Sequence, residues 1–209
     1  MAKPNRVTPF GAIVASPQRG TLLGNRGSIH RGDRPEIARQ WQVRRWIACQ
    51  LHYKGWVAPK WQRGRWTALF FLDEAVALAA GHRPCALCRR ADYERYRDAW
   101  EAASGARLSA DDMDRVLHAE RVDGTAKRTH RVPWADLPTG AYATPDGRQA
   151  LLVLDDRLLP FSEAASAYGE PVARPGSGTA TVLTPPSSLA VLRHGYMAAV
   201  HPSAGGAAG

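Results

Sequence analysis

The spacing of hydrophobic positions changes along the chain and predicts a mixture of strands and helices. Apolar and polar residues alternate over 43–54, which is typical of a strand, and Gly55 is expected to end it. A basic loop or hairpin follows over 56–65. The aromatic-rich stretch 66–71 then predicts a second strand.

Three helices are expected next. Asp73 is a suitable N-cap for a helix over 74–80, and Gly81 is a typical helix stop. A second helix is predicted over 89–103, with three aromatic residues at helical spacing, and a third over 109–121 that begins with a capping serine.

The later part of the chain combines turn signals with short apolar runs. Residues 142–154 predict a hairpin around a Pro-Asp-Gly turn, and a short helix is expected to open near Pro186 and end at 194–195. With 15 prolines and 19 glycines in 209 residues, the chain has many turns. We therefore expect an α+β fold.

The charge of the chain is unevenly distributed. Residues 1–66 contain thirteen lysines and arginines against two acidic residues, whereas the rest of the chain is slightly acidic, although the whole carries a formal charge of +9. Such a concentration of positive charge indicates a polyanionic partner such as nucleic acid.

Tryptophans are interleaved with these basic residues, five of the seven lying between positions 41 and 66. Cations neutralise phosphates, and exposed indoles can stack on bases. Alternatively, the tryptophans belong to the core or form a protein-binding patch. The residues predicted to contact nucleic acid are Arg26, Arg44, Arg45, Trp46, Trp56, Lys60, Trp61, Arg63 and Arg65.

The cysteine content indicates the redox compartment. The sequence has only three cysteines, which argues against a disulfide framework. The first ten residues lack the apolar run of a secretory signal, and no apolar stretch is long enough to span a membrane. A cytoplasmic protein is expected.

Two of the cysteines form a Cys85-x-x-Cys88 pair between one helix end and the next helix start. Thiolates at this spacing can bind one tetrahedral metal ion, and a helix N-terminus favours their negative charge. The alternatives are a redox pair, for which a thioredoxin-like βαβ context is missing, or two ordinary buried cysteines. Zinc is the expected cofactor.

The segment 70–89 contains Gly-His-Arg-Pro-Cys-Ala-Leu-Cys after an alanine-rich helix, and it resembles the second half of the Ada-type zinc-binding domain. The resemblance covers about residues 67–100. In that family a strand, a helix, this motif and a further helix form half of a four-cysteine zinc site on DNA. Only Cys49 is available upstream here, so the resemblance implies zinc held by Cys49, Cys85 and Cys88 with a histidine or water as fourth ligand.

His52 is the first choice for that ligand because it follows Cys49 at a plausible spacing, although a regular strand would place the two on opposite faces. His30 is the second choice, and His82 and His118 are less suitable. Three thiolates and one histidine give the zinc site a charge of −1, which makes each sulfur a weaker nucleophile than in a four-cysteine site. A structural zinc is therefore expected rather than a methyl-accepting cysteine.

An enzymatic alternative comes from His118-Ala-Glu120. Zinc-dependent deaminases combine a His-x-Glu motif with a Pro-Cys-x-x-Cys motif, in which the glutamate transfers protons. Here the cysteine pair precedes the His-x-Glu motif, the reverse of the usual order. In this hypothesis His118 and Glu120 are the catalytic residues of a hydrolase that acts on nucleobases or nucleic acid.

These interpretations give a coarse plan of the chain. The favoured function is a zinc-containing nucleic-acid-binding protein, with DNA favoured over RNA, that acts in DNA repair or base processing. The expected parts are a basic, loop-rich arm over 1–40, an Ada-like zinc module over 41–105, a C-terminal α/β portion over 106–201 packed against it, and a disordered tail over 202–209.

Overall fold

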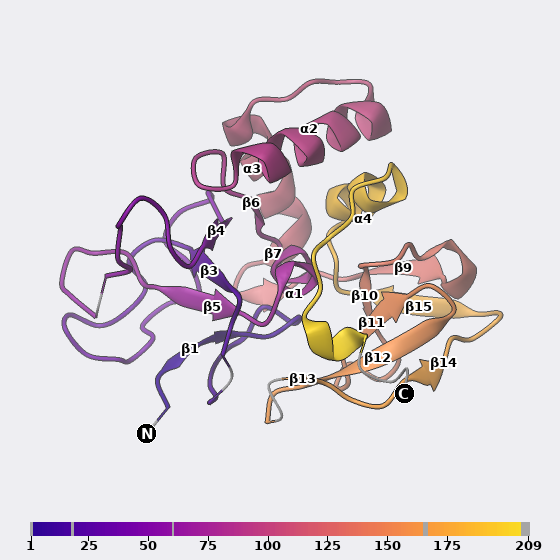
Figure 1. Ribbon diagram of the computed structural model, residues 1–209, viewed down its shortest axis with the longest axis horizontal. Coiled ribbons are helices and arrows are strands. Elements are labelled where there is room, and N and C mark those ends of the chain that lie inside the picture. The colour runs from indigo at the N-terminus through magenta and orange to yellow at the C-terminus, as the bar shows by residue number, and fades with distance from the viewer. Residues whose placement is uncertain (1, 18, 60, 165–166, 206–209) are drawn as a thin grey trace.

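The computed structural model describes residues 2–17, 19–59, 61–164 and 167–205, and it confirms the α+β class. Figure 1 shows a sheet from the N-terminal part on one side and a sheet from the C-terminal part on the other. The elements are β1 (Pro4–Val7), β2 (Ile13–Ala15), β3 (Leu22–Asn25), β4 (Ile47–Gln50), β5 (Leu69–Phe71), α1 (Glu74–Ala79), β6 (Arg83–Pro84), α2 (Arg90–Ser104), α3 (Ala110–Arg121), β7 (Val122–Asp123), β8 (Ala126–Lys127), β9 (His130–Pro133), β10 (Tyr142–Thr144), β11 (Leu151–Leu154), β12 (Arg157–Ser162), β13 (Ala167–Tyr168), β14 (Val172–Ala173), β15 (Thr179–Val182) and α4 (Pro186–Arg193), with short 3-10 helices at Trp134–Asp136 and Pro202–Ala204.

The N-terminal sheet has the strand order β2-β1-β5-β3-β4-β6. Most neighbours are antiparallel, but β1 runs parallel to β5, and β4 runs parallel to β6. The β4–β6 pairing places Ala48 opposite Pro84 and so joins two segments that are far apart in the sequence. This edge of the sheet positions the cysteines.

The C-terminal sheet has the order β13-β12-β11-β10-β15-β9, with β14 paired to β12, and it separates two cores. Because side chains alternate along a strand, Leu151 and Val153 face the core formed with α2, α3 and α4. Leu152 and Leu154 face the opposite way, into a core shared with α1 and the N-terminal sheet. Both halves of the chain are thus joined by continuous packing.

Several predicted elements are confirmed together with their end signals. The Asp73 carboxylate accepts a hydrogen bond from Val76 N at 2.9 Å and caps α1. The Ser109 hydroxyl caps α3 in the same way. The hairpin of β10 and β11 turns at Asp146, which accepts hydrogen bonds from two backbone amides. Helix α4 begins at Pro186 as expected.

Other expectations differ from the structure. The segment 1–40 is not a separate loop-rich arm, because β1, β2 and β3 pair into the same sheet as β4–β6. The strand predicted over 43–54 is limited to β4. The boundary at 105 lies inside one core, since Tyr96 and Trp100 of α2 pack with α4 and the C-terminal sheet.

The predicted tail over 202–209 is also ordered in its described part. Residues Pro202–Ala204 form a 3-10 helix, and the Ser203 hydroxyl accepts a hydrogen bond from Tyr168 N at 3.1 Å. Ala204 is buried. Residues 206–209 lie outside the described residues. In the described part of the chain, none of the helices has the length and apolar character needed to cross a membrane.

Candidate metal centre and nucleic-acid interface

The three cysteines come together where β4 meets the turn that precedes α2. Cys49 lies in β4, and Cys85 directly follows β6. The amide of Cys85 donates to the carbonyl of Ala48 at 3.0 Å, which extends the β4–β6 pairing and brings Cys85 beside Cys49. The Sγ atoms of Cys49, Cys85 and Cys88 all lie within 4.8 Å of one another. This group of three, the cysteine triad, could hold a metal ion.

Backbone amides point at two of the sulfurs. Gln50 N donates to Cys88 Sγ at 3.4 Å, and Leu87 N donates to Cys85 Sγ at 3.5 Å. A hydrogen bond from the Cys49 thiol lowers the pKa of Cys85 to about 5, whereas the same bond raises the pKa of Cys49. Amide donors and a following helix N-terminus both stabilise thiolates, which are the form that binds metal.

The triad lies near the surface. Cys49 and Cys88 are partly exposed, Cys85 is buried, and the intervening Leu87 is 70% exposed. A metal ion can therefore reach the sulfurs from solvent, while the buried Cys85 connects the centre to the core. This combination suits a metal that stabilises a local fold.

None of the histidines considered as fourth ligand joins the triad. His52 is exposed and lies beyond the end of β4. Both ring nitrogens of His30 are engaged, Nδ1 with Thr67 Oγ1 at 2.6 Å and Nε2 with Gln62 O at 3.1 Å. His82 is fully buried and accepts a hydrogen bond from Arg26. Among the described residues, the group consists of the three cysteines alone.

The predicted catalytic pair is not assembled at the triad either. His118 packs edge-on against Trp41, and burial lowers its pKa to about 4. Both carboxylate oxygens of Glu120 accept hydrogen bonds from Ser187, at 2.6 and 2.9 Å, so Glu120 holds the first turn of α4. The deaminase-like arrangement requires His118 on the metal, and the geometry does not provide it.

The residues predicted to contact nucleic acid divide into surface and buried sets. Arg44, Arg45, Arg63 and Arg65 are exposed, and Trp56 is 42% exposed. Its indole stacks on Trp66, with ring centroids 5.5 Å apart and nearly parallel planes. These side chains are accessible to a large ligand.

Two of the predicted residues are buried and do not belong to this exposed surface. Arg26 is 1% exposed and Trp46 is 3% exposed, because the pairing of β3 and β4 carries both into the interior. Trp61 is partly buried and packs edge-on against His30. Lys60 lies outside the described residues.

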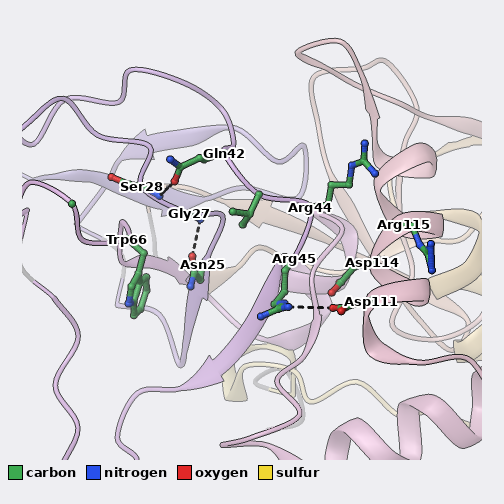
Figure 2. A pocket seen from close by; sticks show the side chains of 12 residues that line it. Asn25, Gly27, Ser28, Gln42, Arg44, Arg45, Trp66, Asp111, Asp114 and Arg115 are labelled. Carbon is green, nitrogen blue, oxygen red and sulfur yellow. Dashed lines mark hydrogen bonds and ion pairs between the residues drawn. The ribbon is translucent and has the colours of Figure 1, made fainter.

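Two of these exposed arginines, Arg44 and Arg45, line a wide hollow between the loop after β3 and helix α3, with a volume of about 1020 Å³. Figure 2 shows Trp66 on one side, Arg115 on the other and Arg45 between them. Arg45 pairs with Asp111 at 3.2 Å and Arg115 pairs with Asp112, whereas Arg44 forms no ion pair with a described acid. Sequence reasoning missed Arg115, which only the packing of α3 brings here.

The geometry thus defines an α+β protein with a three-cysteine candidate metal centre and a separate hollow lined by three arginines and two aspartates. No protein-family description, curated protein or solved structure matches the chain.

Proposed function

We propose that this protein contains zinc and binds nucleic acid, with DNA as the expected partner. The observation that carries the proposal is the group of exposed arginines that lines the hollow, Arg44 and Arg45 before β4 and Arg115 on α3. Arg44 and Arg45 lie on the segment that enters β4. A metal on Cys49 would hold that strand in place and with it the two arginines.

The triad suits zinc by its donor chemistry. Zinc favours tetrahedral sulfur and nitrogen ligands, with Zn–S distances of about 2.3 Å and hence sulfurs about 3.8 Å apart. Sulfurs that already lie within 4.8 Å of one another need only small side-chain movements to reach that spacing. Since no described histidine or carboxylate joins the triad, water is our proposed fourth ligand. A zinc ion held by Cys49, Cys85 and Cys88 would cross-link β4 to the turn that precedes α2.

The basic surface suits a phosphate backbone. The exposed cations among the described residues of 1–66 outnumber the exposed acids, Asp33 and Glu36, by a wide margin. Only two of them form ion pairs with described acids, Arg31 with Glu36 and Arg45 with Asp111. The stacked indoles of Trp56 and Trp66 offer an aromatic face for unpaired bases. The Ada-type resemblance of the cysteine motif further favours DNA.

Binding should be measured by electrophoretic mobility shift with single- and double-stranded DNA and RNA over 50–200 mM salt. The double charge reversal Arg44→Glu with Arg65→Glu is expected to weaken binding by at least about tenfold and to make the dependence on salt shallower. Arg148→Glu, on the exposed turn between β10 and β11, is the control for a change in net charge. No binding at 100 mM salt would refute the proposal.

The metal is tested separately by elemental analysis. One zinc per chain is expected, with loss of stoichiometric zinc in Cys88→Ser and retention in His52→Ala and His118→Ala. Loss of zinc in a histidine variant would instead name a protein ligand and overturn the water ligand. Tight partner binding that does not change with salt would favour a protein-interaction surface over nucleic acid.

A further inference from the structure

Three cations meet around a buried tryptophan in a part of the molecule that the proposed interface does not use. The guanidinium carbons of Arg26 and Arg121 each lie 4.0 Å from the ring centroid of Trp46. Each of these arginines is 1% exposed. Lys127 of β8 lines the same cavity and is partly buried. We call Arg26, Arg121 and Lys127 the cation cluster.

None of the three cations forms an ion pair with a described acid, and the Asp114 carboxylate acts on Arg121 only from beyond ion-pair distance. The hydrogen bonds of the cluster go to neutral acceptors: the carbonyls of Gly11, Arg44, Ala79 and Gly81, and ring nitrogens of His82 and His118. Arg26 Nη2 and Arg121 Nε are buried and have no hydrogen-bond partner in the described structure. Burial, together with mutual repulsion for Arg26 and Lys127, lowers the pKa of Arg26 and Arg121 to about 9 and that of Lys127 to about 7.

Buried positive charge that no contacting acid compensates is costly, and the cost falls when an anion binds between the cations. The surroundings also hold the donors in place. His82 Nε2 accepts a hydrogen bond from Arg26 Nε at 3.3 Å, and Arg121 Nη1 donates to Gly81 O at 2.7 Å. Because these side chains are already held in place, little conformational entropy is lost when an anion binds to them.

A small cavity of about 30 Å³ is lined by all three cations. It shares Gln40, Trp41 and Thr125 with a wider surface hollow of about 590 Å³, which Arg39 also lines. The inner space holds only one or two atoms of the size of a water oxygen. Terminal oxygens of an anion can therefore enter, while the rest of the ligand would lie in the outer hollow.

We propose that the cation cluster binds the phosphoryl group of a phosphate monoester, supplied by the terminal phosphate of a nucleic acid. A dianion matches several converging cations better than a carboxylate does. A terminal phosphate monoester has three unlinked oxygens to share among the cations, whereas an internal phosphodiester has two and is flanked by the chain on both sides. The proposed phosphate site is inferred from the cation cluster alone, whereas its assignment to the ends of nucleic acids rests on the proposed function.

The test uses the full chain and two probes. Inorganic phosphate, compared with chloride at equal ionic strength, is expected to raise the melting temperature. Oligonucleotides of one sequence with a 5′-phosphate, a 3′-phosphate or only hydroxyl ends are compared by fluorescence anisotropy. One phosphorylated end is expected to bind about tenfold tighter than the hydroxyl form, as charge-assisted hydrogen bonds allow.

Lys127→Met is expected to abolish both effects, whereas Lys3→Met, which removes an exposed lysine, leaves them unchanged. If Lys127→Met does not fold, Thr125→Glu replaces it, because Thr125 is exposed at the mouth of the cavity and a carboxylate there repels phosphate.

Stabilisation by inorganic phosphate without any preference for phosphorylated ends would support the site and identify free phosphate as its source. The absence of both effects, with hydroxyl-ended DNA still bound, would overturn this inference and leave the proposed function standing. Effects that persist in Lys127→Met and Thr125→Glu would also overturn it.

Discussion

Replacing Asp114 by asparagine tests the most deeply buried ion pair that supports the metal centre. Asp114 of α3 receives two hydrogen bonds from Arg83 of β6, from Nη2 to Oδ2 at 2.7 Å and from Nε to Oδ1 at 3.0 Å. The side chains are 4% and 2% exposed, respectively. Arg83 lies two residues before Cys85, so this pair ties the start of the cysteine turn to α3.

The expected cost follows from the geometry. Removing one partner of a buried pair typically costs about 3–5 kcal/mol, because the remaining charge is left without compensation. Asparagine keeps the shape and one acceptor but turns an N–H group toward a guanidinium donor, so a value near the lower end, about 3 kcal/mol, is expected. For a chain of this size that corresponds to a fall in melting temperature of about 6–12 °C.

The assay is urea unfolding followed by tryptophan fluorescence, with zinc present. Asp111→Asn is the matched control, since Asp111 lies on the same helix and pairs with Arg45 at the surface, where both side chains are more than half exposed. A loss below about 1 kcal/mol is expected there. Equal stability of the two variants would refute the reasoning that burial gives the Arg83–Asp114 pair its importance.

Three further predictions follow from other contacts. Burial lowers the pKa of His82 well below its usual value, so the folded protein favours the neutral ring. The contribution of His82 to the free energy of unfolding is therefore fully present above about pH 6.5, and it falls by up to about 1.4 kcal/mol per pH unit below that. His82→Asn should reduce this slope in acid unfolding curves, and exposed His194→Asn should not. Gly81→Ala should lower the free energy of unfolding by more than 2 kcal/mol, because φ is +88° and a Cβ would lie 2.5 Å from Arg121 Cδ, whereas Gly105→Ala, with open space around it, should cost only about 1 kcal/mol in urea titrations. Removing metal with a chelator should lower the melting temperature, and adding zinc back should restore it; an unchanged melting temperature would contradict a structural metal.

Local chemistry made several elements predictable. Helix caps act over three or four residues, so Asp73 and Ser109 identified the starts of α1 and α3 without knowledge of the rest of the chain. The two residues between Cys85 and Cys88 likewise fix a geometry that is visible in the sequence. The position of Cys49 beside them was expected from the Ada-type resemblance, and the β4–β6 pairing provides it.

Long-range packing could not be predicted in the same way. The glycine-punctuated segment around Gly24 resembles a loop, yet it forms β3 by pairing with β4 and β5. A Cβ at Gly24 would lie 2.4 Å from the Phe71 ring. Glycine is needed there for close packing rather than for a turn. His52 was favoured as a ligand because of its spacing from Cys49, but the chain leaves the strand after Gln50 and His52 is exposed.

The same limit applies to the arginines, and it changes how the charge of the chain is understood. Nothing in the sequence separates Arg26 from Arg44, since both are arginines near glycines or tryptophans in one basic segment. The pairing of β3 with β4 and β5 buries Arg26 and leaves Arg44 at the surface. Exposed arginines attract a polyanion over long distances, and salt weakens this attraction. A buried guanidinium instead favours one small anion at close range. The arginines of residues 1–66 therefore lie in two different electrostatic environments, with Arg26 buried beside Arg121 and Lys127 and the others at the surface. Only substitutions made in each environment can assign binding to one or the other.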